Sequence, residues 1–395
     1  MNIDEARTLF PGARDQIYLD LSLNALMPAP ARDAALAHLE KRVMGRVVKS
    51  ELHAQAEVVR EQVARLLGAT PEEIAITKNV SEGLNLFAAS LPWEAGDNVV
   101  FCPELEHPNN VFLWYNLART RGVEVREVPP ENGHVPVAAM ATAMDGHTRV
   151  VTASHVTFSP GFVTDVGRLA RAARDCGALT LIDAAQSAGG LHTDVRSLEV
   201  DALALGTQKA LMAFSGLGFL YVRRELADAI NPVFAARYAV ELGADAHETA
   251  ISDGAFDFKA GARRFELSNY NYVGLAAVEA SLGLLLEIGM EAVEDHLRGL
   301  SSRLASGLLE VGLPVAGGEP GPHLAQIVAV GETGGGRHDG ADDPAMNELH
   351  CHLTENGVRL SVRRGVLRMS LGIYNTAEEV DRVVELCREW VRGRR

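Results

Sequence analysis

Short apolar runs alternate with segments of helical pattern through most of this chain. Helices are predicted between the runs, for example over Ser81–Ser90 and Val166–Cys176. Strands that are apolar on both faces must be covered on both sides, and the intervening helices provide that cover. We therefore predict an α/β fold with a mainly parallel seven-stranded sheet. Its predicted strands are Ile74–Thr77, Asn98–Phe101, Val123–Val128, Val150–Ser154, Leu179–Ile182, Ala202–Leu205 and Gly218–Val222.

The C-terminal part of the chain has a different pattern. A long helix over Val273–Leu286 is expected to lead out of the sheet region. After it, short strands and helices predict a smaller α+β domain. The expected division is a large domain over residues 17–285 and a small domain made of residues 1–16 and 286–395. The elements of the small domain are predicted at Ile327–Val330, Ala345–Asn356, Val358–Leu360, Leu367–Ser370 and Thr376–Arg392.

Composition excludes several classes of protein. The 395 residues carry a formal net charge of -15 and no lysine- or arginine-rich block, so a nucleic-acid partner is not expected. No uncharged apolar run is long enough to span a bilayer, and the N-terminus lacks a signal-peptide pattern. The four cysteines are far apart and form no Cys-x-x-Cys pair, which predicts neither disulfides nor a metal site. We expect a cytoplasmic protein.

Polar side chains follow two neighbouring strands of the predicted sheet. Lys209 comes after the strand Ala202–Leu205, and Asp183 and Gln186 come after Leu179–Ile182. In open α/β sheets, ligands bind at the carboxyl ends of the strands. A lysine amine can form an imine with an aldehyde and later move a proton. A carboxylate can hold a pyridinium nitrogen protonated, and an amide can donate to a ring hydroxyl. Alone, each residue is more simply a surface or turn residue, but together they favour pyridoxal phosphate.

Two further segments fit the same ligand. Thr77–Asn85 joins a strand to a helix, where free backbone N–H groups and the Ser81 hydroxyl can bind a phosphate. The simpler interpretation is a plain helix cap. His107 follows the strand Asn98–Phe101, and its flat imidazole can stack on a pyridine ring, although such a loop histidine is often merely exposed. His155 also follows a strand, and a structural role is the simpler expectation for it.

An arginine in the small domain is a candidate for binding a substrate carboxylate. Arg363 lies in the run Leu-Ser-Val-Arg-Arg-Gly-Val-Leu-Arg, and its planar guanidinium can pair with a carboxylate through two hydrogen bonds. Arg364 and Arg368 compete for this role, and a structural salt bridge is the alternative.

These residues together resemble the class V group of pyridoxal-phosphate enzymes of fold type I. That group includes cysteine desulfurases, cysteine C–S lyases, isopenicillin N epimerase-like proteins and some aminotransferases. The resemblance runs from Ile17-Tyr18-Leu19-Asp20 to Tyr374-Asn375-Thr376 and includes the segment from Arg264 to Tyr272. It implies a homodimer with active sites at the subunit interface, acting on a small amino-acid substrate.

The resemblance also implies a role for each candidate residue. Lys209 matches the Schiff-base lysine, Asp183 the pyridinium partner, His107 the stacking ring and Gln186 the partner of the ring hydroxyl. By the same resemblance, Val80, Ser81 and Gln208 bind the cofactor phosphate, and Arg363 and Asn24 bind the substrate. Asn269 is implied to bind the phosphate of the cofactor in the neighbouring subunit.

The chain departs from the desulfurase pattern in ways that bear on the reaction. Desulfurases carry a cysteine on a loop after the matching arginine, whereas here Arg363 is followed almost at once by the final strand. Phe158 stands where an asparagine is usual, and Gly206 and Gln208 replace a serine and a histidine. We therefore expect β-elimination of the C–S lyase type without a persulfide cysteine. Transamination and epimerisation remain alternatives.

Two interpretations from other classes are disfavoured. A nicotinamide-dependent dehydrogenase would need a Gly-x-Gly-x-x-Gly turn after the first strand, where this chain has Asn-Val-Ser-Glu-Gly. A non-catalytic, cofactor-binding regulator would be expected to carry a fused DNA-binding helix-turn-helix, and the short acidic arm at the start gives no sign of one.

Overall fold

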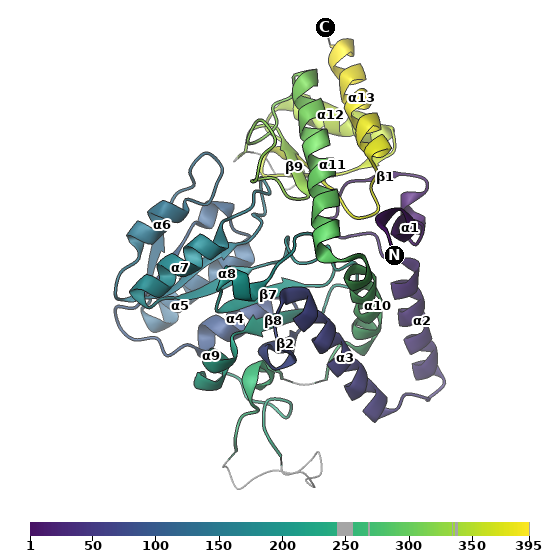
Figure 1. Ribbon diagram of the computed structural model, residues 1–395. Helices are drawn as coiled ribbons and strands as arrows, with labels where there is room; N and C mark the ends of the chain where they lie inside the picture. Colours follow the sequence, from purple (N-terminus) through teal and green to yellow (C-terminus); the bar gives the residue numbers. More distant parts are fainter. Residues whose placement is uncertain (243–255, 268, 334, 336–338, 395) are drawn as a thin grey trace.

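The computed structural model describes all residues except 243–255, 268, 334, 336–338 and 395 (Figure 1). The strands of its central sheet are β2 (Ile74–Thr77), β3 (Asn98–Phe101), β4 (Glu124–Glu127), β5 (Thr148–Ser154), β6 (Leu179–Asp183), β7 (Ala202–Gly206) and β8 (Gly218–Val222). They lie in the order β2-β8-β7-β6-β5-β3-β4. Only β8 runs antiparallel to its neighbours. The connection from β7 to β8 is too short for the crossover helix that a parallel pair needs. The mainly parallel seven-stranded sheet is thus confirmed.

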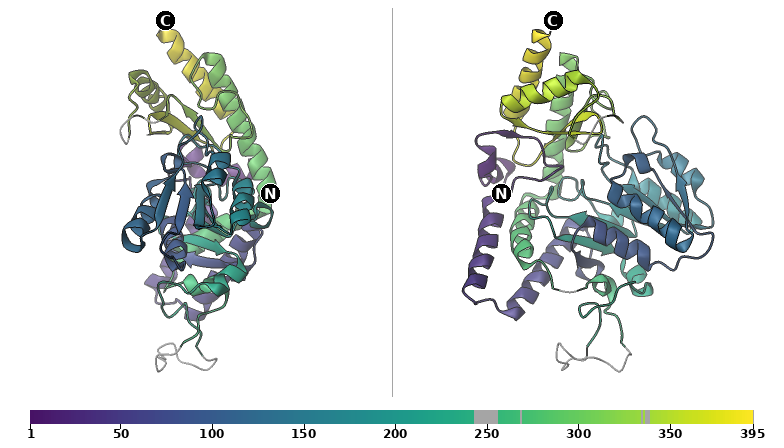
Figure 2. Two further views of the ribbon diagram at one scale, coloured as in Figure 1. Left: turned by 90° about the vertical axis from the view of Figure 1, so that its left-hand side faces the viewer. Right: turned by 180° about the vertical axis from the view of Figure 1, so that it is seen from behind.

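Alternate residues of each strand face opposite layers of helices, because successive side chains in a strand point to opposite sides. On one face, Ala202 and Ala204 belong to the same core as α4 and α5. On the other face, Leu203 and Leu205 belong to the core formed with α3 and α10. α6 and α7 cover the far end of that second face (Figure 2). The helices are α3 (Lys49–Leu67), α4 (Val80–Ser90), α5 (Phe112–Arg121), α6 (Val137–Ala143), α7 (Val166–Cys176) and α10 (Tyr272–Ile288).

The C-terminal region forms a second unit around a three-stranded antiparallel sheet, in the order β11-β12-β9. The long helix α11 leads from the large sheet to this unit (Figure 1). Near the start of the chain, β1 pairs in parallel with β10, so the N-terminal segment is joined to the C-terminal unit. The elements are β1 (Ile17–Tyr18), β9 (Ile327–Val330), β10 (Val358–Arg359), β11 (Ser361–Arg363), β12 (Val366–Ser370), α11 (Met290–Val311), α12 (Pro344–Glu355) and α13 (Ala377–Gly393).

The remaining helices are short or lie at the surface: α1 (Ile3–Arg7), α2 (Ala29–Val43), α8 (Val195–Leu198) and α9 (Arg224–Ala229). Within the described ranges, no single helix is long and apolar enough to cross a membrane. α10 and α11 pass together on length and composition but meet at an 83° bend.

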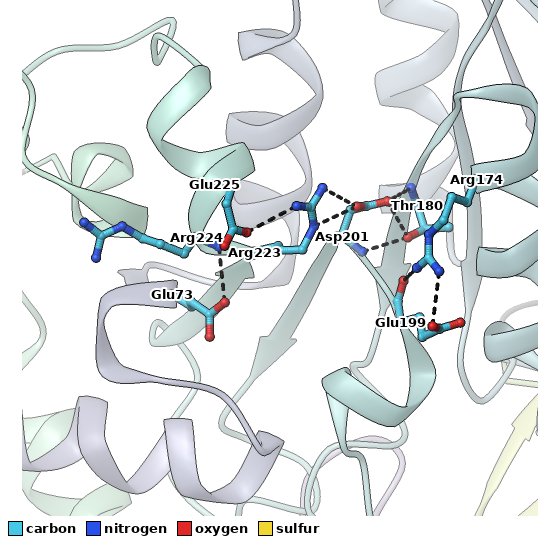
Figure 3. Close-up of polar contacts among 8 residues, drawn as sticks. All are labelled: Glu73, Arg174, Thr180, Glu199, Asp201, Arg223, Arg224 and Glu225. Carbon is cyan, nitrogen blue, oxygen red and sulfur yellow. Dashed lines mark hydrogen bonds and ion pairs between the residues drawn. The ribbon is translucent and has the colours of Figure 1, made fainter.

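A polar network ties the amino ends of β6 and β7 to the carboxyl end of β8 (Figure 3). Asp201, just before β7, accepts hydrogen bonds from the Thr180 backbone N–H (2.9 Å) on β6 and from Arg223 Nε (3.2 Å) after β8. Arg174 donates to Glu199 at the same edge (3.1 Å). These contacts hold three strands in register at one edge of the sheet, opposite the edge where ligands bind.

Candidate active site

A cavity of about 440 Å³ opens at the carboxyl ends of the parallel strands. The large sheet, the segment after β1 and the C-terminal unit all contribute residues to it. The structure therefore brings together most of the residues that the sequence singled out. The predicted residues lining the cavity are Val80, Ser81, His107, Asp183, Gln186, Gln208, Lys209 and Arg363.

Lys209 lies in the turn that follows β7, and its side chain projects into the cavity. The turn is fixed by a hydrogen bond from the Met212 N–H to the Lys209 carbonyl (2.7 Å). Burial lowers the pKa of the Lys209 amine, Asp183 opposes this shift and Arg368 adds to it, so that the pKa is about 8. A substantial fraction of the amine is therefore neutral near physiological pH, as a nucleophile or base requires.

Asp183 ends β6 and is almost fully buried. Its Oδ1 atom accepts a hydrogen bond from the Ala185 N–H (2.8 Å). Burial raises the pKa of the carboxyl, whereas that bond and the charge of Lys209 lower it. A buried carboxylate of this kind gains stability from a cationic partner such as a protonated ring nitrogen.

His107 presents a neutral imidazole to the cavity. Its Nδ1 atom accepts a hydrogen bond from the Asn109 N–H (3.2 Å), which leaves the ring proton on Nε2. Burial and the charge of Lys209 lower the pKa of His107 to about 4. Phe158 packs against the imidazole edge to face, with 5.1 Å between ring centroids. The ring is therefore uncharged and fixed in orientation, as stacking on an aromatic ligand requires.

The N-terminus of α4 forms one end of the cavity. Asn79 is the N-cap of this helix, and its side chain accepts a hydrogen bond from the Glu82 N–H (2.8 Å). Asn79, Val80 and Ser81 all line the cavity. The N–H groups in the first turn of a helix have no partner within the helix, and the helix dipole is positive there. With the Ser81 hydroxyl and Gln208, this end suits a phosphate group.

Three buried polar atoms on lining residues have no hydrogen-bond partner: Ser22 Oγ, Gln186 Oε1 and Arg368 Nε. Buried polar atoms in folded proteins are normally paired, so this concentration in one cavity fits a site built for a polar ligand. The Gln186 amide nitrogen makes one long bond, to the Ser22 carbonyl (3.3 Å). The residues present therefore fit pyridoxal phosphate.

Two arginines of the C-terminal unit reach the cavity, and they are bonded differently. Arg368 donates from Nη1 to the Phe158 carbonyl (3.0 Å), and its guanidinium lies 4.9 Å from the Phe158 ring centroid. Arg363 donates to Asp339 (2.8 Å), whose side chain is 76% exposed. Arg364 does not line the cavity. Of the three arginines that the sequence offers for binding a substrate carboxylate, two therefore remain, Arg363 and Arg368.

The turn between β11 and β12 is a tight two-residue turn and carries no inserted loop. It consists of Arg364 and Gly365, both with left-handed φ values (+50° and +85°), and links a directly paired Arg363 and Val366. A Cβ atom on Gly365 would lie 2.8 Å from the Glu332 carbonyl oxygen, so glycine is required there.

No cysteine side chain is available to the cavity. None of the four cysteines, all within the described part of the chain, lines it. Cys102 and Cys387 are buried in the core, and Cys351 is exposed on α12. The structure therefore offers no described thiol that could receive sulfur at this site.

Three residues considered from the sequence lie outside the cavity. Asn24 is exposed, and its neighbours Ser22 and Leu23 line the cavity instead. Asn269 accepts a hydrogen bond from Tyr238 (3.2 Å) and lines two neighbouring surface hollows. His155 is buried with its Nδ1 atom unpaired, and burial lowers its pKa to about 4.

Several residues of the site were missed from the sequence. Ser22, Asn109 and Ser154 line the cavity, and Glu106 lies behind it. Glu106 could have been found, because a carboxylate between a buried strand and a candidate ring-stacking histidine is unusual. Ser22 had no local signal, since it reaches the site through the long-range pairing of its segment with Ser370.

Comparisons with known proteins agree with this geometry. The family model described as aminotransferase class-V matches residues 17–383. A probable cysteine desulfurase of Methanothermobacter thermautotrophicus is 31% identical, over 98% of each chain. The apo structure of a cysteine desulfurase from Thermococcus onnurineus superposes with a TM-score of 0.83 at 26% identity, covering 99% of this chain and 98% of that one. A cystine C–S lyase in complex with cysteine persulfide shares the fold, with a TM-score of 0.83 at 22% identity over 96% and 99%.

Proposed function

Because this chain belongs to the class-V aminotransferase family and has pyridoxal 5'-phosphate as its cofactor, we propose that it acts on an amino acid by removing the Cα proton and expelling a sulfur-bearing group from Cβ. The observation that carries the proposal is the cavity in which Lys209 and Asp183 meet with no cysteine beside them. When bound, the cofactor supplies the electron sink that such a reaction needs.

Lys209 is the base in this proposal. Its amine lies in the cavity, and its pKa of about 8 allows it to take a proton near neutral pH and to return it later. Asp183 would hold a positive charge on the ring nitrogen of the cofactor, and the neutral His107 imidazole would lie against the ring. Val80, Ser81 and Gln208 line the cavity and would hold the phosphate.

Arg368 is the better candidate for holding the substrate carboxylate. Its Nε atom has no hydrogen-bond partner, and its Nη2 atom makes only a long contact with Ser361 Oγ (3.5 Å). The Nε–Nη2 edge is the one that pairs with a carboxylate through two hydrogen bonds. Arg363, the residue favoured from the sequence, already pairs with Asp339. We therefore assign the carboxylate to Arg368 and a secondary role to Arg363.

The lining residues favour elimination over epimerisation. Inversion at Cα through a second base needs a proton-carrying group on the face opposite Lys209. Among the described lining residues there is no second lysine and no tyrosine or cysteine. His107 is a poor second base, because its low pKa means that the imidazole binds a further proton only weakly. One lysine is sufficient for elimination, and also for transamination, which remains the second candidate because the matching family model is that of aminotransferases.

The first experiment tests the cofactor linkage. The purified protein should be yellow, and borohydride reduction followed by peptide mass mapping should place the cofactor on Lys209. Lys209→Ala should lose the trapped adduct. A colourless wild-type protein that regains no colour with added pyridoxal phosphate would contradict the proposal.

The second experiment identifies the reaction. A thioether or disulfide of cysteine plus water should give pyruvate, ammonia and a thiol or persulfide without any added acceptor. A strict requirement for a keto acid would indicate transamination. Exchange and inversion at Cα without release of ammonia would indicate epimerisation.

A further inference from the structure

A buried carboxylate lies behind the cavity without a role in the proposed reaction. Glu106 is fully buried, directly before His107 in the chain. Its oxygens accept hydrogen bonds from the Ser154 N–H (2.6 Å), from Ser154 Oγ (2.6 Å) and from Asn110 Nδ2 (2.8 Å). None of the ion pairs formed by the described residues includes it. Keeping a carboxyl here costs free energy through desolvation, so its presence needs a reason.

These hydrogen bonds connect His107 and Asp183, the two residues that would hold the cofactor ring. Ser154 ends β5 and pairs in register with Asp183 on β6, and the adjacent His155 N–H donates to the Asp183 carbonyl (2.9 Å). Glu106 therefore fastens the loop that carries His107 to the strand beside Asp183. Among the described residues, the other side-chain hydrogen bonds between this loop and β5 join Asn110 to Thr152 (3.0 and 3.3 Å), further from the strand end.

The charge of Glu106 also acts on the site. Burial and the nearby Asp183 raise the pKa of Glu106 to about 7, and hydrogen bonds from Ser154 and Asn110 oppose this shift. The other charged or titratable groups nearby are Lys209, which acts on Asp183, and the Cys102 thiol, whose pKa is raised to about 12. When Glu106 is ionised, it adds a second negative charge behind Asp183, which stabilises a positive charge on the cavity side of that carboxylate.

We propose that Glu106 is a positioning residue of this active site, which holds His107 and Asp183 in a fixed relation through Ser154 and whose negative charge strengthens the hold of Asp183 on a protonated cofactor ring. The inference rests on the proposed function, because it takes pyridoxal phosphate to occupy the cavity.

The test uses the holoenzyme and Glu106→Gln, which keeps the shape of the side chain and removes its charge. The readout is the pH midpoint at which the visible absorbance band of the lysine-bound cofactor is lost. The band belongs to a cationic form, so removing a nearby negative charge should lower the midpoint, by roughly half a pH unit or more. The circular dichroism of the bound cofactor should also weaken, because the His107 loop is held less firmly.

Asp201→Asn is the matched control. It removes another largely buried carboxylate that accepts several hydrogen bonds, but at the opposite edge of the sheet (Figure 3). It should lower thermal stability and leave the midpoint unchanged. If Glu106→Gln does not fold, Ser154→Ala is used to test the role of Glu106. Losing the Ser154 Oγ bond makes ionised Glu106 less stable, so the midpoint should shift in the same direction.

The two proposals fail separately. A wild-type protein without a visible band contradicts the proposed function. A wild-type protein with the band, and a folded Glu106→Gln holoenzyme with the same midpoint and the same cofactor dichroism, overturns the role of Glu106 alone. The latter result would make Glu106 a structural residue of the β3 loop.

Discussion

At the scale of single residues, the chemistry of the site depends on how burial changes ionisation. Lys209 and Asp183 shift each other toward the charged state, yet burial dominates both, lowering one pKa and raising the other. Each group is therefore held closer to its neutral form than in water. A cofactor that places a cation beside Asp183 and bonds covalently to the Lys209 amine removes the free-energy cost of burying each of these groups.

The pKa of Lys209 predicts how the apoenzyme takes up its cofactor. Only the neutral amine attacks an aldehyde, and the fraction of neutral amine increases as the pH rises through about 8. The rate of cofactor attachment should therefore rise with pH and level off above that value. Stopped-flow absorbance on apoenzyme mixed with pyridoxal phosphate measures it. A rate independent of pH across this range would mean that amine ionisation does not limit the reaction.

The two cavity arginines predict a ranked pair of substitutions. Arg368→Lys should raise KM for the amino-acid substrate by about tenfold or more, because one charge-assisted hydrogen bond of a two-bond pair is lost. Arg363→Lys should have a smaller effect, since Arg363 pairs with an exposed carboxylate. Steady-state kinetics of both variants, with cofactor content equalised, decides between them. The reverse ranking would restore the assignment of the carboxylate to Arg363.

At the scale of elements, the N-terminus of α4 contributes both to the stability of the fold and to the binding of phosphate. Asn79→Ala removes the N-cap bond to the Glu82 N–H and should cost about 1 kcal/mol of unfolding free energy. It should also weaken cofactor affinity several-fold, because the first turn of α4 lines the cavity. Denaturant unfolding of the apoenzyme and cofactor dissociation measure the two effects.

Thr376→Ala provides the comparison for that prediction. Thr376 is the N-cap of α13, far along the chain in the C-terminal unit, and its side chain accepts from the Glu379 N–H (3.3 Å). Its loss should lower stability by a similar amount and leave cofactor affinity unchanged. Equal losses of affinity in the two variants would mean that the effect follows from stability alone.

The elements themselves were largely predictable from the sequence, and the reasons are physical. The strands Ile74–Thr77, Asn98–Phe101 and Gly218–Val222 were predicted with their observed bounds, because buried strands are continuous apolar runs between polar turns. α2 was not predicted, since it buries only Ala31 and Ala35 and so has almost no apolar stripe.

The site was predictable where one strand end supplies both position and chemistry, as for Lys209 and Asp183. It was not predictable where the register between paired segments determines which side chains reach the cavity. Arg363 and Arg368 lie on adjacent strands of one hairpin, and which guanidinium pairs with another residue depends on Asp339, from a separate segment. Asn24 lies beside lining residues but outside the cavity, a difference that only the path of the backbone determines.

At the scale of the whole molecule, Asn269 allows a test of the predicted homodimer. Within one chain this residue lies outside the cavity that contains Lys209. If it contacts the phosphate of a neighbouring subunit, each site needs Lys209 from one chain and Asn269 from the other. Lys209→Ala and Asn269→Ala should each impair activity as pure dimers.

Hybrid dimers of the two variants then distinguish the arrangements. In a hybrid, the site built on the Asn269→Ala chain keeps its own Lys209 and receives an intact Asn269 from its partner. Coexpression with two affinity tags, followed by isolation of the doubly tagged species, should therefore recover activity at one of its two sites. If Asn269 acts within its own chain, neither site of the hybrid is complete, and activity stays at the level of the Asn269→Ala dimer or below. Recovery thus depends on the exchange of a side chain between subunits, which a merely stabilising role of Asn269 cannot produce.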